Sequence, residues 1–283
     1  MKAKNWLHAV HGSPQAKAPD IARIAEMPIP GSNLLERIRQ KTRRTLSESL
    51  AKRLCPCRPA TPVVSFTFDD FPKNSVTVGA SILQAFDVRA TYYTAFGLMG
   101  QHAPTGQMFD RYDLDALQAF GHELGCHTFA HNHAWDTPTK TFSASVEANR
   151  RALMVMLPGA TFATLSYPIS APKPSIKKAA GRRFRACRAG GQAANVGIAD
   201  LNSLKSFFLE RSREDASKIR RLIDATCQSN GWLIFSTHDV SSSPTRYGCT
   251  PEFFRQVVQW TVASGARILP VNAALDEIGV QSM

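Results

Sequence analysis

The sequence has no long hydrophobic run. In its 283 residues no stretch approaches the roughly 18 apolar residues that a membrane-spanning helix needs. Met1 is followed by Lys, His, Gln, Asp and Pro rather than by an apolar segment, so we expect no signal peptide and a cytoplasmic protein. The six cysteines are scattered, and Cys55 and Cys57 do not form a C-x-x-C pair. This pattern favours reduced thiols over a zinc knuckle or a redox site.

Positive charge is concentrated near the N-terminus. Apolar residues make up 43% of the chain and charged residues 20%, which is typical of a globular protein large enough for one α/β domain. The net charge is +12. Residues 1–60 hold 12 Lys and Arg against 4 Asp and Glu, whereas residues 61–283 hold 22 against 18. We therefore divide the chain into a basic extension, residues 1–62, and a main domain, residues 63–283.

The extension contains one predicted amphipathic helix. From Leu34 to Leu46, and on to Leu50 and Leu54, apolar residues recur at helical spacing beside a basic face. Three interpretations stay open: the helix packs on the main domain, binds an anionic membrane surface such as the inner membrane, or binds an acidic partner. Charge alone does not indicate nucleic-acid recognition. Residues 1–32 are expected to be loosely structured and residues 55–62 to be a linker.

In the main domain, predicted strands and helices alternate, which indicates a mostly parallel sheet. Chemically reactive residues follow four predicted strands: Asp69 and Asp70 after 63–68, His127 after 123–126, Pro168 after 161–167, and His238 after 232–237. Parallel α/β barrels build their active sites at the carboxyl ends of the strands. The sequence therefore favours a distorted (β/α) barrel over an open doubly wound sheet.

Two short segments carry the chemistry. Thr67-Phe68-Asp69-Asp70 offers adjacent carboxylates, and His127-Thr128-Phe129-Ala130-His131 offers two imidazoles four residues apart, which can face one point on a loop or a helical turn. One Asp and two His are a common ligand set for a catalytic divalent metal. The second Asp is then placed to take a proton from a water molecule that the metal activates. His238 has a side chain suited to protonating a leaving amine.

These motifs, with Tyr167-Pro168 and the late Thr237-His238, resemble the polysaccharide deacetylase family, carbohydrate esterase family 4, over residues 63–272. The resemblance implies a distorted (β/α) barrel, zinc or sometimes cobalt or manganese, and removal of an acetyl group from a sugar. Carried over by position, Asp69 resembles the general base and Asp70 a metal ligand. His127 and His131 resemble the metal-binding histidines, and His238 resembles the general acid.

The third motif departs from the family pattern Arg-x-Pro-Tyr/Phe-Gly. Here Ser166 replaces the Arg that orients the base, and Ile169 replaces the aromatic residue whose backbone N–H serves the oxyanion. We expect Arg185 or Arg188 to supply the missing guanidinium, and name Tyr167, Ile169 and Arg188 as oxyanion or substrate contacts. The Asp that tunes the acid histidine in many members has no clear match, with Asp239 and Asp200 as the candidates.

Seven Lys and Arg lie between residues 173 and 188 with no acid among them. This cluster suggests an anionic substrate, such as a nucleotide-linked or lipid-linked amino sugar. The leading hypothesis is a metal-dependent hydrolase that removes an N-acetyl group from a saccharide. Two alternatives stay open: a hydrolase of a non-sugar amide or cyclic imide on the same fold, and a degenerate member that only binds carbohydrate or a partner.

Overall fold

The computed structural model describes residues 34–169, 171–213 and 215–281. The segment 1–32, expected to be loosely structured, lies outside the described residues. Among the described residues, the helices are too short or too polar to cross a lipid bilayer.

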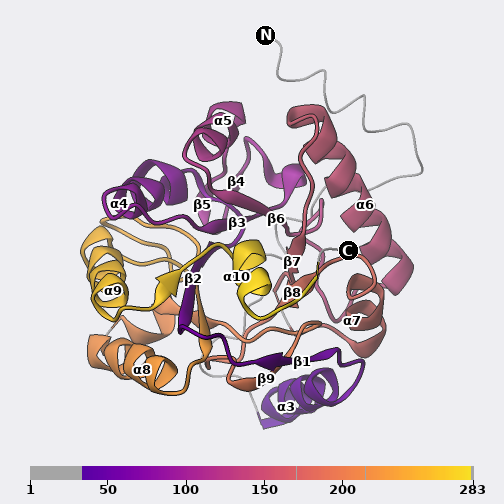
Figure 1. The fold of residues 1–283 in the computed structure, drawn as a ribbon. Coiled ribbons are helices and arrows are strands. Elements are labelled where there is room, and N and C mark those ends of the chain that lie inside the picture. Colours follow the sequence, from indigo (N-terminus) through magenta and orange to yellow (C-terminus); the bar gives the residue numbers. More distant parts are fainter. Residues whose placement is uncertain (1–33, 170, 214, 282–283) are drawn as a thin grey trace.

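A curled sheet of eight parallel strands forms the centre of the molecule (Figure 1). The strand order is β10–β11–β2–β3–β6–β7–β8, and β12 pairs with the first residues of β2. The strands are β2 (Val63–Phe68), β3 (Thr91–Thr94), β6 (Glu123–Cys126), β7 (Thr164–Ser166), β8 (Ala186–Arg188), β10 (Phe207–Phe208), β11 (Trp232–Thr237) and β12 (Arg267–Ile268).

The sheet closes on itself only through an irregular segment. Residues 201–204, just before β10, exchange backbone hydrogen bonds with β8: Cys187 N–H donates to Leu201 O at 2.7 Å, and Leu204 N–H donates to Cys187 O at 2.8 Å. Because this contact replaces a regular strand pair, the barrel is distorted at this point. The distorted (β/α) barrel that the sequence predicts is confirmed.

Helices surround the sheet and bury its outer face (Figure 1). A π-helical turn, Ser75–Ala80, leads into α4. The surrounding helices are α4 (Ser81–Gln84), α5 (Arg111–Ala119), α6 (Thr139–Met156), α7 (Pro174–Ala180), α8 (Ala216–Gln228) and α9 (Pro251–Ala263). Every residue of β2 and β11 is buried, because both faces of these central strands are covered. Such strands appear in the sequence as continuous apolar runs, and these two were predicted with the observed bounds.

Several short elements give no clear sequence signal. The strands β8, β9 (Gly197–Asp200) and β10 have four residues or fewer, too few to show an alternating pattern. The same is true of the hairpin formed by β4 (His102–Ala103) and β5 (Gly106–Gln107). The final helix, α10 (Val271–Glu277), also lay outside the predicted elements.

The basic extension contributes a helix and a strand. Helix α3 spans Leu34–Ser49, and β1 (Leu54–Cys57) pairs antiparallel with β9. The linker expected over 55–62 is therefore wrong for Cys55–Cys57, which form part of this small sheet. No sequence pattern indicated β9, so the strand partner of β1 could not be predicted.

Helix α3 packs on the barrel through its polar side. Ser47 is buried and Gln40 and Arg43 are half-buried, whereas the apolar Ile38 and Leu46 are exposed. The Lys177 ammonium, fully buried, donates to the carbonyls of Ser47 at 2.6 Å and Leu50 at 3.0 Å, and pairs with Asp200 at 2.6 Å. A cation at these carbonyls stabilises the helix end. The apolar stripe of the helix thus faces away from the barrel.

Glu123 joins three elements at the amino end of the barrel, where α10 covers the strands (Figure 1). Its carboxylate accepts the Asn272 N–H of α10 at 2.8 Å and the Thr164 hydroxyl of β7 at 3.3 Å. Burial raises the pKa of Glu123 from 4.5 to about 7 and outweighs these hydrogen bonds, which lower it. Glu123 therefore keeps its proton to a higher pH in the folded protein than in the unfolded chain.

We predict that Glu123→Gln removes a pH dependence of stability. In the wild type, unfolding releases the Glu123 proton between pH 4.5 and about 7, so this residue's contribution to the free energy of unfolding falls as pH rises through that window. The total change is up to about 3 kcal/mol. Urea unfolding of both proteins across pH 4–8 measures it, in the difference between their stabilities. A difference that stays constant with pH would contradict the prediction.

Candidate active site

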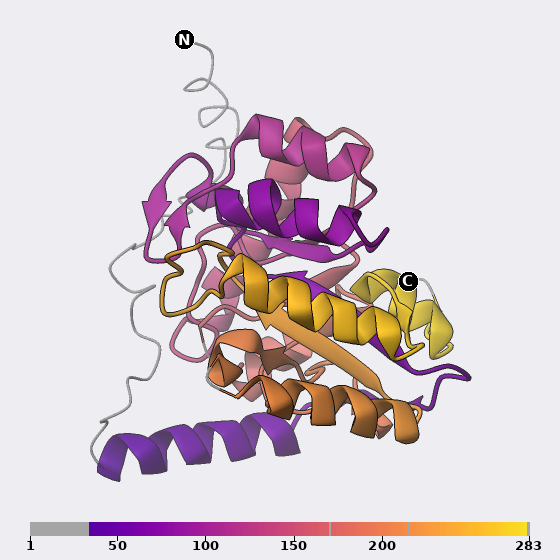
Figure 2. The same cartoon turned by 90° about the vertical axis from the view of Figure 1, so that its left-hand side faces the viewer.

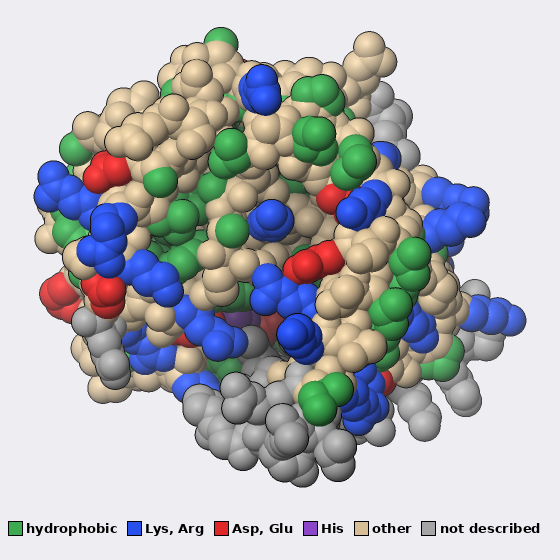
Figure 3. Space-filling model, turned by 90° about the horizontal axis from the view of Figure 1, so that it is seen from below, with side chains coloured by type: hydrophobic (Ala, Val, Ile, Leu, Met, Phe, Trp, Pro, Cys, Tyr) green, Lys and Arg blue, Asp and Glu red, His purple; other side chains and the backbone are tan. Residues whose placement is uncertain are grey.

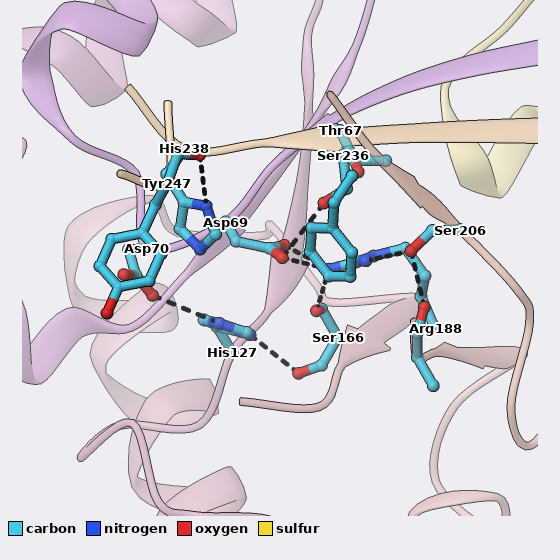
Figure 4. A network of polar contacts seen from close by, with 12 residues as sticks. Thr67, Asp69, Asp70, His127, Ser166, Arg188, Ser206, Ser236, His238 and Tyr247 are labelled. Atoms are coloured by element: carbon cyan, nitrogen blue, oxygen red, sulfur yellow. Dashed lines mark hydrogen bonds and ion pairs between the residues drawn. The ribbon is translucent and has the colours of Figure 1, made fainter. Parts of the chain in front are cut away.

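The predicted reactive residues meet at the carboxyl edge of the sheet. Asp69 and Asp70 follow β2, His127 follows β6, and His238 follows β11. All of these side chains are at least nine-tenths buried. Figure 4 shows Asp69 between His238 on one side and the Arg188 side chain on the other, with Asp70 and His127 beside them.

Asp70, His127 and His131 form a compact cluster. The Asp70 Oδ1 atom lies 2.8 Å from His131 Nε2 and 3.4 Å from His127 Nε2, and the three ligand atoms lie within 4.8 Å of one another. Ligand atoms around a tetrahedral zinc ion are separated by about 3.3 Å. The spacing of the cluster therefore suits a divalent metal.

The hydrogen bonds of the cluster also favour a cation. His127 Nδ1 lies 2.8 Å from the carbonyl oxygen of Ser166, so Nδ1 carries the proton and Nε2 presents a lone pair to Asp70. The Asp70 Oδ1 atom is buried and has no hydrogen-bond donor among the described residues. A carboxylate oxygen and an imidazole lone pair repel each other unless a positive charge lies between them. The residues present thus fit a metal ion.

The two histidines converge through a strained loop, which is the first of the two expected arrangements, a loop or a helical turn. The backbone φ angles of Thr128 and His131 are +56° and +47°, and those of Asp70, Phe71 and Ile169 are also in the left-handed region. These five are among nine such non-glycine residues in the described chain, so the strain is concentrated here. Each costs about 1–3 kcal/mol and persists only where the surroundings hold it.

Neighbouring elements hold this loop in place. The Ser145 hydroxyl of α6 accepts the N–H groups of Phe129 and Ala130, both at 3.0 Å. Gly97 approaches the Phe129 carbonyl so closely that a Cβ atom would lie 2.4 Å from that oxygen. On the far side of the cluster, the Thr105 hydroxyl, between β4 and β5, donates to Asp70 Oδ2 at 3.1 Å. Nothing in the local sequence indicated the contribution of Thr105.

Asp69 is held by Arg188. The Arg188 guanidinium contacts both carboxylate oxygens of Asp69 and the hydroxyl of Ser166 (Figure 4). The Ser236 hydroxyl donates to Asp69 Oδ2 at 3.2 Å. Burial alone would raise the pKa of Asp69, but Arg188, His127 and His238 outweigh it, and the pKa lies below the ordinary value. Asp69 is therefore ionised at neutral pH.

The rest of the Arg188 guanidinium is enclosed as well. Its second terminal nitrogen donates to the Ser206 hydroxyl at 2.7 Å. The aromatic rings of Tyr93 and Phe208 lie 5.1 and 5.7 Å from its central carbon, within the range of cation–π contacts. Only 1% of the residue is exposed.

The other members of the predicted basic cluster lie elsewhere. Arg185 pairs with Asp276 at 2.6 Å, next to α10 at the opposite end of the barrel, so it does not supply the guanidinium. Lys177 binds the end of α3, Lys173 donates to the Thr137 carbonyl, and Arg183 donates to the Ser143 carbonyl. Among these five residues only Arg188 contacts Asp69, so their contacts give no support for an anionic substrate.

His238 is oriented by a backbone carbonyl. Its Nδ1 lies 3.2 Å from Tyr247 O, which leaves Nε2 available, and the Tyr247 ring lies 5.5 Å away (Figure 4). Neither candidate carboxylate performs this role. Asp239 accepts the N–H and hydroxyl of Thr245, and Asp200 pairs with Lys177.

Sequence analysis missed a carboxyl group beside His238. The β10–β11 register pairs Phe208 with Ser236, so the segments that carry Glu210 and His238 leave the sheet at the same edge. Glu210 itself lies in the 3-10 helix Leu209–Ser212, and its electrostatic interaction with His238 shows that the two groups are close. The Glu210 Oε2 atom is buried without a hydrogen-bond partner among the described residues. Burial raises the pKa of Glu210 to about 7; His238 and Arg211 lower it, and Asp69 raises it. Because β10 has only two residues, no sequence pattern could place Glu210 here.

Residues 58–184 match the family model described as polysaccharide deacetylase. This part of the chain is thus similar to the polysaccharide deacetylase family. A search of curated proteins gave no match.

Solved structures of polysaccharide deacetylases share the fold. The chitin deacetylase of Colletotrichum lindemuthianum has a TM-score of 0.54 at 16% identity, over 78% of this chain and 89% of that one. A family 4 acetyl xylan esterase from Clostridium thermocellum, in complex with a cobalt ion, has 0.51 at 18% identity, over 77% and 93%. A family 4 pseudoenzyme from Bacillus anthracis has 0.52 at 11% identity, over 77% and 67%.

Compared with the polysaccharide deacetylase family pattern, the guanidinium of this chain comes from the neighbouring strand. Ser166 lies at the end of β7, where the family pattern has Arg, and its small side chain leaves room for Arg188 from the adjacent β8. The two positions are direct partners in the β7–β8 register. Of our two candidates, Arg188 is thus the residue that contacts Asp69.

The expectation that Tyr167 contacts substrate is wrong. Its N–H donates to the Arg188 carbonyl at 3.0 Å and its hydroxyl to the Asn202 carbonyl at 3.1 Å, and the side chain is buried in the core. Both donors are therefore in use. By contrast, Ile169 is half-buried with a φ of +68°, and its N–H has no hydrogen-bond partner in the described part of the chain. Ile169 remains the candidate for the oxyanion contact.

We predict that Arg188→Ser destabilises the protein and that Ser166→Arg in the same chain reverses part of the loss. The single variant leaves the Asp69 carboxylate buried without its cation, which costs about 3–5 kcal/mol. The double variant returns a guanidinium to the same space from β7. Urea unfolding of the wild type and both variants measures the effect. A double variant no more stable than Arg188→Ser would show that a guanidinium from position 166 does not reach Asp69.

Proposed function

We propose that this protein is a metal-dependent hydrolase that removes an N-acetyl group from an amino sugar. The proposal rests on one observation: a candidate metal-binding cluster and two further groups lie together at the mouth of the barrel, the carboxyl edge of the sheet. The two groups are Asp69, which is ionised and held by Arg188, and His238, whose Nε2 atom is available. The match of residues 58–184 to the polysaccharide deacetylase family model supports the substrate class.

Asp70, His127 and His131 would hold the metal. When bound, a divalent ion, with zinc the leading candidate and cobalt or manganese as alternatives, acts as a Lewis acid toward water and the acetyl carbonyl. Asp69 accepts a proton from the attacking water, whose oxygen forms the new bond to the acetyl carbon. Because Arg188 and Ser236 engage Oδ2 and only Arg188 engages Oδ1, the Oδ1 atom is the freer acceptor.

The remaining steps use His238 and Ile169. The Ile169 N–H donates a hydrogen bond to the negative charge that develops on the carbonyl oxygen. When the C–N bond breaks, His238 donates its Nε2 proton to the amine, and acetate leaves. An amine is a poor leaving group unless it is protonated, whereas an ester oxygen depends less on an acid. The presence of His238 therefore favours an N-acetyl substrate.

Metal analysis and an acetate-release assay test this proposal. We expect purified protein to bind about one divalent ion per chain and to release acetate from one or more of three substrate types: polymeric, oligomeric and nucleotide-linked N-acetyl sugars. Removal of the metal with a chelator should abolish release, and zinc or cobalt should restore it. Protein that is metal-free and inactive on all three types, even after addition of zinc or cobalt, would refute the function.

Single variants separate the roles of the two aspartates. Asp69→Asn should keep the metal and lower turnover about 10²–10⁴-fold, as expected for a lost general base. Asp70→Asn should lose the metal, and the exposed Asp115→Asn serves as the matched control. Loss of metal from Asp69→Asn instead would mean that the two aspartates have the opposite roles.

We predict that Glu210→Gln narrows the active pH range on its alkaline side. Above its pKa of about 7, Glu210 carries a negative charge that interacts with His238, and this charge favours the protonated imidazole that acts as the acid. The glutamine removes the charge, so activity should begin to fall at a lower pH than in the wild type. Acetate release measured across pH 5–10 tests this, and superimposable profiles would assign Glu210 no influence on His238.

A further inference from the structure

Exposed large hydrophobic side chains are concentrated on one face. Ten are exposed in the described residues, and six of them lie on or next to α3, β1 and β9. We call this set the α3–β1 face: Ile38, Leu46, Leu50, Leu54, Val196 and Ile198. Contiguous apolar surface of this kind marks an interaction site more often than scattered single residues do.

Chain connectivity and strand pairing place these residues close to one another. Leu50 directly follows α3 and Leu54 begins β1, where Pro56 pairs in register with Ile198 of β9. Pro56 is exposed as well, on the same side of its strand as Leu54. Helix α3 lies at the outer edge of the molecule in both Figure 1 and Figure 2. Its docked side carries Ser47, so the exposed stripe is not needed for packing on the barrel.

Positive charge surrounds the α3–β1 face. Residues 34–60 contain eight Lys and Arg against two Glu. Lys41, Lys52 and Arg58 are exposed, while Glu48, one of the two acids, pairs with Arg44 at 2.7 Å. Figure 3 shows this side of the molecule, with hydrophobic side chains interspersed among many Lys and Arg side chains.

We propose that the α3–β1 face binds the surface of an anionic lipid bilayer. A helix that presents apolar side chains flanked by cations lies in the headgroup region, where the apolar groups enter the acyl boundary and the cations meet lipid phosphates. A second copy of this chain fits the charge less well, because the exposed cations of this region, Lys41, Lys52 and Arg58, would meet the same cations of the other copy. This inference is independent of the proposed catalytic activity.

The same contact would bring the active-site mouth near the lipid. Arg43 of α3 pairs with Asp136 at 2.6 Å, and its guanidinium lies 5.4 Å from the Trp135 ring. Both partners belong to the loop that follows the metal-binding His131. Because the exposed stripe lies on the opposite side of α3, bilayer binding would keep this rim of the mouth one helix diameter, ~10 Å, from the headgroups.

Vesicle co-sedimentation of the full chain tests the proposal. We expect binding to phosphatidylcholine vesicles that contain about 30% phosphatidylglycerol, and much weaker binding to phosphatidylcholine alone or in about 0.5 M salt. Leu46→Glu with Leu50→Glu should weaken binding about tenfold or more. The matched control is Val155→Glu with Val262→Glu, on α6 and α9, whose exposed fractions of 51% and 44% resemble the 40% and 48% of Leu46 and Leu50. Circular dichroism verifies that both double variants fold.

Three results would overturn the proposal. The first is wild-type protein that stays in solution with anionic vesicles. The second is equal binding by the two double variants, which would place the contact elsewhere. The third is a wild-type protein that does not bind vesicles but forms a dimer or a complex with the acidic probe polyglutamate. The double variant Leu46→Glu with Leu50→Glu would then abolish that dimer or complex. That result would assign the face to a second copy or an acidic protein.

Discussion

An ionised carboxylate in a protein interior needs a positively charged partner. The arrangement of side chains inside the barrel depends on how this need is met at Asp69. Its partner, Arg188, stands on the last strand of the sheet, four strand positions from β2. The guanidinium must therefore cross the interior, which requires a small side chain at Ser166 and a hydroxyl at Ser206. The pair also joins β2 to the side of the barrel where strand pairing is irregular. Packing, closure and the chemistry of the site thus depend on one buried ion pair.

A second constraint acts on the loops. The carboxyl ends of parallel strands meet at one edge, but residues adjacent in the chain diverge unless the backbone turns sharply. Asp70 and His131 reach the common centre because their backbones adopt left-handed conformations. Hydrogen bonds to the Ser145 hydroxyl and from the Thr105 hydroxyl hold these conformations against their intrinsic strain. A metal would therefore find its three ligands already together.

Sequence reasoning predicted the features that depend on local pattern. The strands 63–68 and 232–237 are long, apolar and followed by reactive residues, so both their bounds and the shared mouth could be foreseen. Arg188, by contrast, could not be separated from Arg185 by spacing, because only the three-dimensional path of β8 decides which side chain points inward. Glu210 and Thr105 lie on elements too short to show a period. The docked side of α3 was also unpredictable, since an apolar stripe ordinarily packs inward, and here a buried lysine and an arginine hold the helix by its polar side.

The placement of the guanidinium has an evolutionary consequence. A chain with Arg at position 166 and one with Arg at position 188 can interconvert through an intermediate with both arginines or with neither. The intermediate with neither leaves Asp69 unpaired in the interior and loses much of the stability of a domain this size. The intermediate with two must fit two long cations into the space that one now fills. Both intermediates are unfavourable. Ser166 and Arg188 are therefore expected to be inherited together, and related sequences should differ at both positions or at neither.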